Sequence, residues 1–440
     1  MSVLSLLVFL PLLTAVFLVL LRDREQQVGA GSSYHVGVDG LSLPLVALTA
    51  LLFFACAVYS LGSDKNRSTF AALFLFLETT SFGLFVSLDL ILFFVFFDLS
   101  IVGMYFVIAG WGHSDAGRAA VKFFLYTFLG SLALLLGFIG LYVASEPHTF
   151  DMVALAAQPP LEDEPLLAGL VLLAIGVGLA VKTPLFPFHT WLPAAHTEAP
   201  AAGSAILAGI LLKMGTYGFV RIAMTMLPAA WNRWAGVVLV VAVVSILWGA
   251  LVALAQTSFK RMVAYTSVNH MGYVLLGLGA VGAAGGDDAA KAVAVTGAVT
   301  QMVSHGLITG ALFLLAGVMW DRRGTYEMDT YGGIAGRAPH FSLLFAVGAF
   351  ASLGLPAPVA TALALLGILV TAGLFLWALQ RVLLGEQRTR GEAFADLRGY
   401  ESAAIAPLLV LSLLIGVLPR WLLDVIEPAA RTVVTLVSGG

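Results

Sequence analysis

Five ionisable residues lie inside stretches of the sequence that are otherwise apolar. They are Asp98, Lys182, Lys213, His270 and His305. A charge at the centre of a bilayer costs on the order of 2.5 to 3.5 kcal/mol on insertion scales, so such residues are rare unless they have a use. Carboxylate, amine and imidazole groups can all take up and release protons. The five residues therefore predict proton transfer through a membrane.

Lys213 is the most informative of the five, because it lies in mid-run and its own apolar run contains no acidic residue. Burial disfavours the charged form of lysine, which suits a group that loads and releases a proton. Asp98 and Lys182 form either a functional pair or a structural ion pair between two helices. His270 and His305 each lie beside a small residue that lets another helix or water approach. A satisfied core histidine is the alternative for both.

A break in the helical pattern follows Lys182 directly. Pro184, Pro187 and Pro193 lie within a dozen residues, and proline at this density cannot continue a helix. Non-helical backbone at membrane depth occurs only where it is buried in protein or lines a hydrated cavity, and it marks transport sites. A later break, Gly354–Pro358, occupies a comparable place in the second half. Paired breaks favour two repeats of transporter type.

Membrane-spanning helices are the elements that must position these residues. The 440 residues are 60% hydrophobic and 11% charged, whereas soluble domains carry about a quarter charged residues. Apolar runs of roughly 18 to 28 residues recur from end to end, which is the length that crosses a bilayer as a helix. The sequence predicts an all-α polytopic membrane protein with about 13 transmembrane helices, the first of them over residues 2–21.

Charge and cysteine content exclude several classes of function. The formal net charge is −3 and the basic residues are scattered, which argues against nucleic acid as a partner. Cys56 is the sole cysteine, so it permits no internal disulfide, no thiolate-held iron–sulfur cluster and no cysteine zinc site. We expect no cofactor or metal in this chain, and if the protein belongs to a redox system, its redox centres are expected elsewhere.

Charged residues between the runs predict the orientation in the membrane. The stretch 145–164 has five acidic and no basic residues, so it is expected to face away from the cytoplasm. Basic clusters, among them Lys260 with Arg261, are assigned to the cytoplasmic side. Glu78 and Asp89 lie nearer to run ends and are interpreted as interfacial.

The same rule exposes a conflict near the start of the chain. Arg22 with Arg24, and Lys65 with Arg67, flank a single helix, and both ends of one helix cannot lie on the cytoplasmic side. Either the first helix inserts against its charge bias, or a spanning segment is missing before His35.

Several long motifs together resemble the proton-pumping, antiporter-like subunits of respiratory complex I. They are Val181–Pro200, Gly203–Gly218, Lys260–Gly272 and Gln301–Gly306. Two further segments, Tyr34–Pro44 and Phe123–Thr127, are most similar to the M-type subunit. The resemblance covers nearly the whole chain. It implies inverted repeats with a broken helix in each, near Lys182–Pro193 and Gly354–Pro358, and a row of ionisable residues along the membrane midplane.

The resemblance also assigns roles. Asp98 stands where a glutamate is usual, Lys182 is its partner lysine and Lys213 is the central lysine. His270 and His305 fall at positions of the hydrated relay. Because the aspartate is one methylene shorter, its separation from Lys182 is expected to differ slightly.

Two departures from the family pattern concern length. The family has an additional early helix before the Tyr34 motif, which matches the topology conflict. It also has a glutamate after the second break that ends the proton row, whereas this chain passes from Pro358 almost directly into the apolar run 363–377. That terminal glutamate has no counterpart.

The resemblance implies a proton-translocating subunit of NADH-quinone oxidoreductase, a multi-pass protein of the cell inner (plasma) membrane. Quinone reduction in partner subunits would drive it, with NADH, flavin, iron–sulfur clusters and quinone bound there, and its partners would be the other membrane-arm subunits, lipid and protons. Two alternatives stay open: a subunit of a cation/proton antiporter or membrane-bound hydrogenase, and a non-conducting structural subunit. The expected divisions are N-terminal helices (1–111), the first core half (112–256), the second core half (257–385), and a C-terminal loop and helix (386–440).

Overall fold

The computed structural model describes residues 27–29, 31–62, 65–283, 287–352, 361–384 and 394–439. The first predicted span (2–21) and the second predicted break (Gly354–Pro358) lie outside these residues. Arg22 and Arg24 lie outside them too, so the topology conflict stays a prediction.

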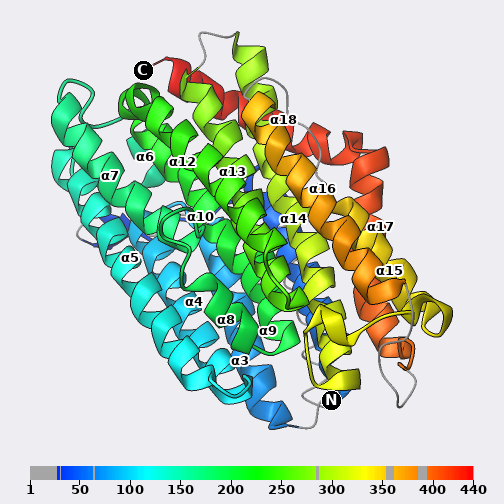
Figure 1. Ribbon diagram of the computed structural model, residues 1–440. Coiled ribbons are helices and arrows are strands. Elements are labelled where there is room, and N and C mark those ends of the chain that lie inside the picture. Colours follow the sequence, from blue (N-terminus) through cyan, green and yellow to red (C-terminus); the bar gives the residue numbers. More distant parts are fainter. Residues whose placement is uncertain are drawn as a thin grey trace.

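Helices make up almost all of the described structure and run side by side in one bundle (Figure 1). Ten helical stretches of the described chain are long and apolar enough to cross a membrane, against about 13 predicted for the whole chain. The predicted all-α polytopic class is confirmed. The α-helices are α2 (Ser42–Tyr59), α3 (Arg67–Val86), α4 (Leu90–Trp111), α5 (Ala116–Ala144), α6 (Met152–Ala157), α7 (Pro165–Lys182), α8 (Leu192–Glu198), α9 (Ala201–Ile206), α10 (Leu212–Gly218), α11 (Met224–Met226), α12 (Pro228–Leu254), α13 (Phe259–Ala283), α14 (Asp288–Arg323), α15 (Pro339–Ala351), α16 (Thr361–Leu383), α17 (Gly399–Val417) and α18 (Arg420–Ser438).

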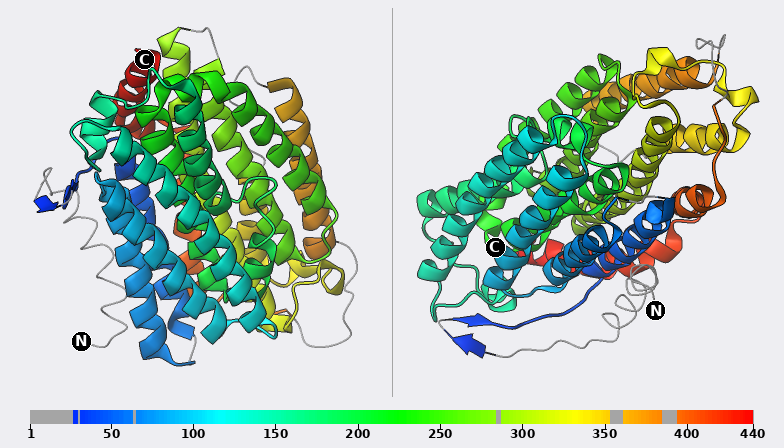
Figure 2. Two further views of the ribbon diagram at one scale, coloured as in Figure 1. Left: turned by 90° about the vertical axis from the view of Figure 1, so that its left-hand side faces the viewer. Right: turned by 90° about the horizontal axis from the view of Figure 1, so that it is seen from below.

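Shorter elements join or interrupt these helices. Two π-helical turns, η2 (Leu207–Leu211) and η3 (Phe219–Ala223), join α9, α10 and α11 into one span. Three 3₁₀ turns are η1 (Ser60–Gly62), η4 (Met328–Thr330) and η5 (Ile334–Gly336). Strands β1 (Gln27–Gly29) and β2 (Ser32–Ser33) pair antiparallel and lie at the edge of the bundle (Figure 2).

Burial separates helices at the centre of the bundle from those at its periphery. The most apolar window of α14 is 100% buried and that of the α9–α11 span is 94% buried, whereas those of α5 and α12 are only 39% and 33% buried. Helix α13 is long enough to cross a membrane but too polar to count among the ten. It packs between α12 and α14, and this protein environment replaces water for its polar side chains.

The predicted break after Lys182 is confirmed. Helix α7 ends there, and regular helix resumes as α8 at Leu192. The freed backbone is satisfied locally: the Leu185 amide donates to the Ala180 carbonyl (3.0 Å), and the Trp191 indole donates to the Val181 carbonyl (2.9 Å). Because these bonds close the break, irregular backbone is tolerated inside the bundle.

Amphipathic helix α18 lies across one end of the bundle (Figure 1) and packs on α14, α12, α11 and α2. Its apolar face is buried, whereas Glu427 and Arg431 pair on its exposed face at 2.6 Å. Because only one face of α18 is apolar, this helix has no apolar run long enough to predict a membrane span.

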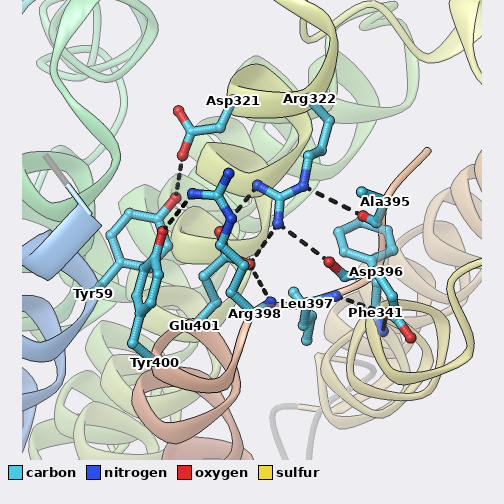
Figure 3. Close-up of polar contacts among 10 residues, drawn as sticks. All are labelled: Tyr59, Asp321, Arg322, Phe341, Ala395, Asp396, Leu397, Arg398, Tyr400 and Glu401. Carbon is cyan, nitrogen blue, oxygen red and sulfur yellow. Dashed lines mark hydrogen bonds and ion pairs between the residues drawn. The ribbon is translucent and has the colours of Figure 1, made fainter. Parts of the chain in front are cut away.

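Charged side chains between α14 and α17 are closely paired (Figure 3). Arg322 of α14 donates to both carboxylate oxygens of Glu401 of α17, at 3.0 and 2.6 Å, and Glu401 is only 1% exposed. The guanidinium also donates to the carbonyls of Ala395 and Asp396, both at 3.3 Å. The Arg398 amide donates to Glu401 at 2.7 Å. A bidentate pair with these extra bonds ties the two helices together.

Candidate functional site

Lys213 is held in the centre of the bundle by neutral groups. It is 0% exposed, and its Nζ donates to the Ala208 carbonyl at 2.6 Å and lies 2.6 Å from His305 Nδ1. Ala208 belongs to the π turn η2, whose widened backbone exposes a carbonyl to a side chain five residues on. Such π turns recur at functional sites. Among the described residues no carboxylate lies within ion-pair distance, 4.0 Å, of Lys213.

The two predicted histidines lie together next to this lysine. The His270 and His305 ring centroids are 5.3 Å apart, and His270 Nδ1 lies 3.3 Å from Gln301 Nε2. His305 Nε2 is buried without a partner. The structure therefore brings Lys213, His305 and His270 into one cluster, from helices α10, α14 and α13.

A cavity of about 190 Å³ opens beside the two histidines. Besides His270 and His305, its polar lining includes Gln301, Ser304 and Ser412. Apolar side chains, among them Ile308 and Phe350, complete the lining. The polar groups and this volume are sufficient for water, which would offer the unpartnered Nε2 a hydrogen bond. The small residues beside the histidines serve helix packing: a Cβ on Gly306 would meet Leu48 at 2.6 Å.

Lys182 forms a second buried amine site at the end of α7. It is 1% exposed, and its Nζ donates to the Ser100 hydroxyl of α4 at 2.8 Å. The same Nζ lies 4.7 Å from the centre of the Phe97 ring, a cation–π distance. The Ser100 hydroxyl in turn donates to the Phe97 carbonyl at 2.6 Å.

The direct ion pair considered for Asp98 and Lys182 is absent from this structure. No Asp98 oxygen is within 4.0 Å of the lysine nitrogen, and Asp98 Oδ1 is buried without a hydrogen-bond partner. The reason is geometric. Asp98 and Ser100 are two residues apart on α4, so they point about 200° apart around the helix, and the short aspartate does not reach across. The carboxylate still attracts Lys182 at longer range.

Lys260 is a third buried lysine. The sequence analysis used it only to assign the cytoplasmic side of the membrane. It is 0% exposed at the start of α13, and its Nζ donates to the Ala199 carbonyl (2.5 Å) and the Tyr326 hydroxyl (3.2 Å). That hydroxyl lies 2.8 Å from His113 Nε2, in the loop between α4 and α5. Burial, with the positive charges of Lys260 and Lys65, lowers the pKa of His113 to about 4.

Two more buried polar residues, His196 and Glu78, were not predicted to belong to the site. His196 of α8 is 0% exposed, stacks on Phe313 with 4.4 Å between ring centroids, and has no hydrogen-bond partner at either ring nitrogen. Its position inside a proline-rich break was the signal available. Glu78, expected at the interface, is 3% exposed within α3 and keeps Oε1 unpartnered. Asp89 instead caps α4 by accepting from the Ile91 and Leu92 amides.

The described residues contain no group of three or more His, Cys, Asp or Glu side chains that could hold a metal ion. The chemistry within reach of these side chains is proton exchange among amines, imidazoles, carboxylates and water.

Comparison with known proteins agrees with this arrangement. Residues 87–385 match the membrane family described as "NADH:quinone oxidoreductase/Mrp antiporter, TM". The chain belongs to this family. The predicted identity as an antiporter-like, M-type membrane subunit of NADH-quinone oxidoreductase is confirmed. As such, the chain is one subunit of an enzyme complex.

Named relatives support the same assignment. The chain is 39% identical to NADH-quinone oxidoreductase subunit M of Rickettsia prowazekii, over 90% of this chain and 82% of the relative. It is 36% identical to the F(420)H(2) dehydrogenase subunit M of Methanosarcina mazei, over 93% of this chain and 86% of the relative. A chain of respiratory complex I from Thermus thermophilus superposes with a TM-score of 0.87 and 30% identity, covering 99% of this chain and 95% of that chain. An Mrp complex from a Dietzia species shares the fold, with a TM-score of 0.81 at 20% identity, covering 100% of this chain and 92% of that chain.

Proposed function

We propose that this family member moves protons along a row formed by Asp98, Lys182, Lys213, His305 and His270. The observation that carries the proposal is the environment of Lys213: a fully buried amine bonded only to a carbonyl and an imidazole. Without a fixed counter-charge, burial disfavours the charged form of such an amine and makes its proton easier to release. It is therefore able to load and release a proton.

The histidines connect this amine to water. A proton from the cavity beside His270 and His305 passes to the imidazole of His305, which touches the lysine nitrogen. Proton transfer needs donor and acceptor within hydrogen-bond distance, directly or through one water. The 2.6 Å contact meets that condition.

Lys182 provides the switch. With its Nζ on Ser100, as here, its positive charge is held away from Asp98. Movement of Nζ toward Asp98 neutralises that charge and makes a proton on Lys213 less unfavourable, since like charges repel across a low-dielectric interior. The two helices are in contact: a Cβ on Gly215 of α10 would lie 2.2 Å from Thr183 Oγ1, just after α7.

The energy would come from quinone reduction in partner subunits, which would carry NADH, flavin, iron–sulfur and quinone sites. The remaining partners would be the other membrane-arm subunits, and the complex would lie in the cell inner membrane. The proposed division is into N-terminal helices 1–111, core halves 112–256 and 257–385, and a C-terminal part, 386–440, which holds α17 and α18.

Substituting Lys213 tests the proposal. Inner-membrane vesicles carrying Lys213→Ala should retain electron transfer from donor to an artificial acceptor that bypasses quinone, yet lose most proton uptake, measured with a pH-sensitive dye. Lys291→Ala removes a lysine at the far end of α14 and serves as the matched control. Undiminished uptake in Lys213→Ala would overturn the proposal, and repeating both assays without sodium separates proton from sodium transport.

A further inference from the structure

A large apolar crevice lies between α7 and α12, apart from the row of ionisable residues. Its volume is about 640 Å³. It extends from Pro165 at the start of α7 to Phe188 in the break that follows Lys182. Apart from Arg233, every lining side chain is apolar or a glycine.

Glycines on α7 leave the crevice open. Gly169 and Gly176 both line it, and a Cβ built on Gly176 would meet no atom within 4 Å. Helix α7 also carries strongly exposed leucines at its rim, with Leu166 79% and Leu173 62% exposed. In a protein that spans a bilayer, an apolar crevice with such a rim is open to lipid.

Polar groups gather at one end of the crevice. Arg233 and Trp234, both exposed, lie near the start of α12. A Cβ on Gly169 of α7 would lie 3.0 Å from Trp234 Nε1, so this end also adjoins the start of α7. Among the described residues no acidic side chain pairs with Arg233. Glu162, Asp163 and Glu164, all exposed, directly precede Pro165.

We propose that the crevice binds one phospholipid with an ethanolamine headgroup. One acyl chain fills the crevice, the phosphate lies on Arg233, and the ammonium lies toward the acidic residues 162–164. Arginine and tryptophan are the residues that hold lipid headgroups at a membrane interface. A purely anionic headgroup fits less well, because the three carboxylates would repel it.

The dimensions fit an acyl chain. The lining residues of α7 extend from Pro165 to Ala180, about 22 Å at 1.5 Å per residue. One leaflet contributes roughly 15 Å of hydrocarbon thickness. A chain of this length anchored at Arg233 therefore fits within the crevice and lies along about two-thirds of it, between α7 and α12.

Photolabelling tests this site in the assembled membrane complex. Vesicles are doped with phosphatidylethanolamine whose acyl chain ends in a diazirine, irradiated, and the labelled peptides of this chain are mapped. We expect label in residues 165–188 and 228–241 above that on the lipid-facing surface of α5. Gly176→Leu, which fills the crevice, should lower this label at least about tenfold, equivalent to about 1.4 kcal/mol.

Matched variants separate the site from general contact with lipid. Gly236→Leu makes the same change at a glycine of α12 that also has open space but does not line the crevice, and its label should stay at the wild-type level. Arg233→Gln should lower label roughly threefold, whereas Arg118→Gln on α5 should not. Unchanged label in Gly176→Leu, or no label in the assembled complex because another subunit covers the crevice, would overturn the proposal. Equal label from a phosphatidylglycerol probe would overturn the headgroup assignment.

Discussion

Charge is handled in opposite ways in two regions of this protein. Between α14 and α17, Arg322 and Glu401 neutralise each other through two hydrogen bonds (Figure 3). In the centre of the bundle, Lys213 and Lys182 are equally buried but bond only to a carbonyl, an imidazole and a hydroxyl. Neutralised charges join helices, whereas buried amines without a counter-ion are poised to exchange protons.

The contrast recurs within one span. Arg221 lies eight residues after Lys213, and its guanidinium donates to Asp39 at 2.6 Å. Burial pushes the pKa of Asp39 up, but Arg221 and hydrogen bonds from Ser42 and Leu41 more than offset this, so that pKa is lowered overall. Among the described residues the arginine thus has a carboxylate partner and the lysine has none, which is the difference expected between an anchor and the proton carrier proposed above.

Breaking the anchored region should have the largest effect. Arg322→Met leaves the Glu401 carboxylate buried and unpaired, which costs about 3 to 5 kcal/mol of folding free energy. Thermal unfolding of the purified complex, followed by fluorescence, should show a clearly lower midpoint. Glu427→Gln, which breaks an exposed pair on α18, should cost less than about 1 kcal/mol. Equal unfolding midpoints in the two variants would show that the buried Arg322–Glu401 pair stabilises the protein no more than the exposed pair on α18.

The central lysine should show the reverse pattern. Lys213→Met leaves no charge unpaired, so it should cost only about 1 to 2 kcal/mol from lost hydrogen bonds, while proton uptake falls at least about tenfold. Arg322→Met complexes that remain assembled should pump normally per complex. A Lys213→Met variant that unfolds like Arg322→Met would show that the lysine is an anchor after all.

Changing the length or the charge of the Asp98 side chain tests whether its carboxylate acts on Lys182. Asp98→Glu adds one methylene and brings the carboxylate closer to Lys182, whereas Asp98→Asn removes the charge. We expect uptake to change by less than about fivefold in Asp98→Glu and to fall further in Asp98→Asn. If Asn pumps as well as Glu, the carboxylate has no role in the switch.

The smallest expected effect concerns pH and His113. Its folded pKa of about 4 lies below the ordinary 6.5, so the unfolded chain binds more protons between these values, and stability is lost as pH falls through that window. Unfolding midpoints measured from pH 7 to pH 4 should fall less steeply in His113→Gln than in wild type. His340→Gln, which alters an exposed histidine bonded to Asp396, is the control. Parallel curves for wild type and His113→Gln would show that the pKa of His113 is not lowered in the folded protein.

The membrane class, the break after Lys182 and the candidate residues could be predicted from the sequence. Each depends on a local property: run length, proline density, or an ionisable side chain within an apolar run. The long motifs added the family, which the relatives confirm.

Other features depend on contacts between distant parts of the chain. Lys260 was assigned to the cytoplasmic side and Glu78 to the membrane interface. Their burial was not predicted, because their neighbours in sequence do not show which helices cover them. Asp98 and Lys182 were considered a pair. On α4, however, Ser100 points toward Lys182 and Asp98 points away from it, so the lysine donates its hydrogen bond to the serine.

The sequence by itself thus determined that this protein crosses a membrane, where its helix breaks and which ionisable residues it carries there, because hydrophobic length and proline act locally. Only the tertiary structure decided which of the charges are neutralised and which lysines remain without a counter-ion. That outcome depends on ångström-scale distances between side chains of different helices, and the packing of the whole bundle sets those distances.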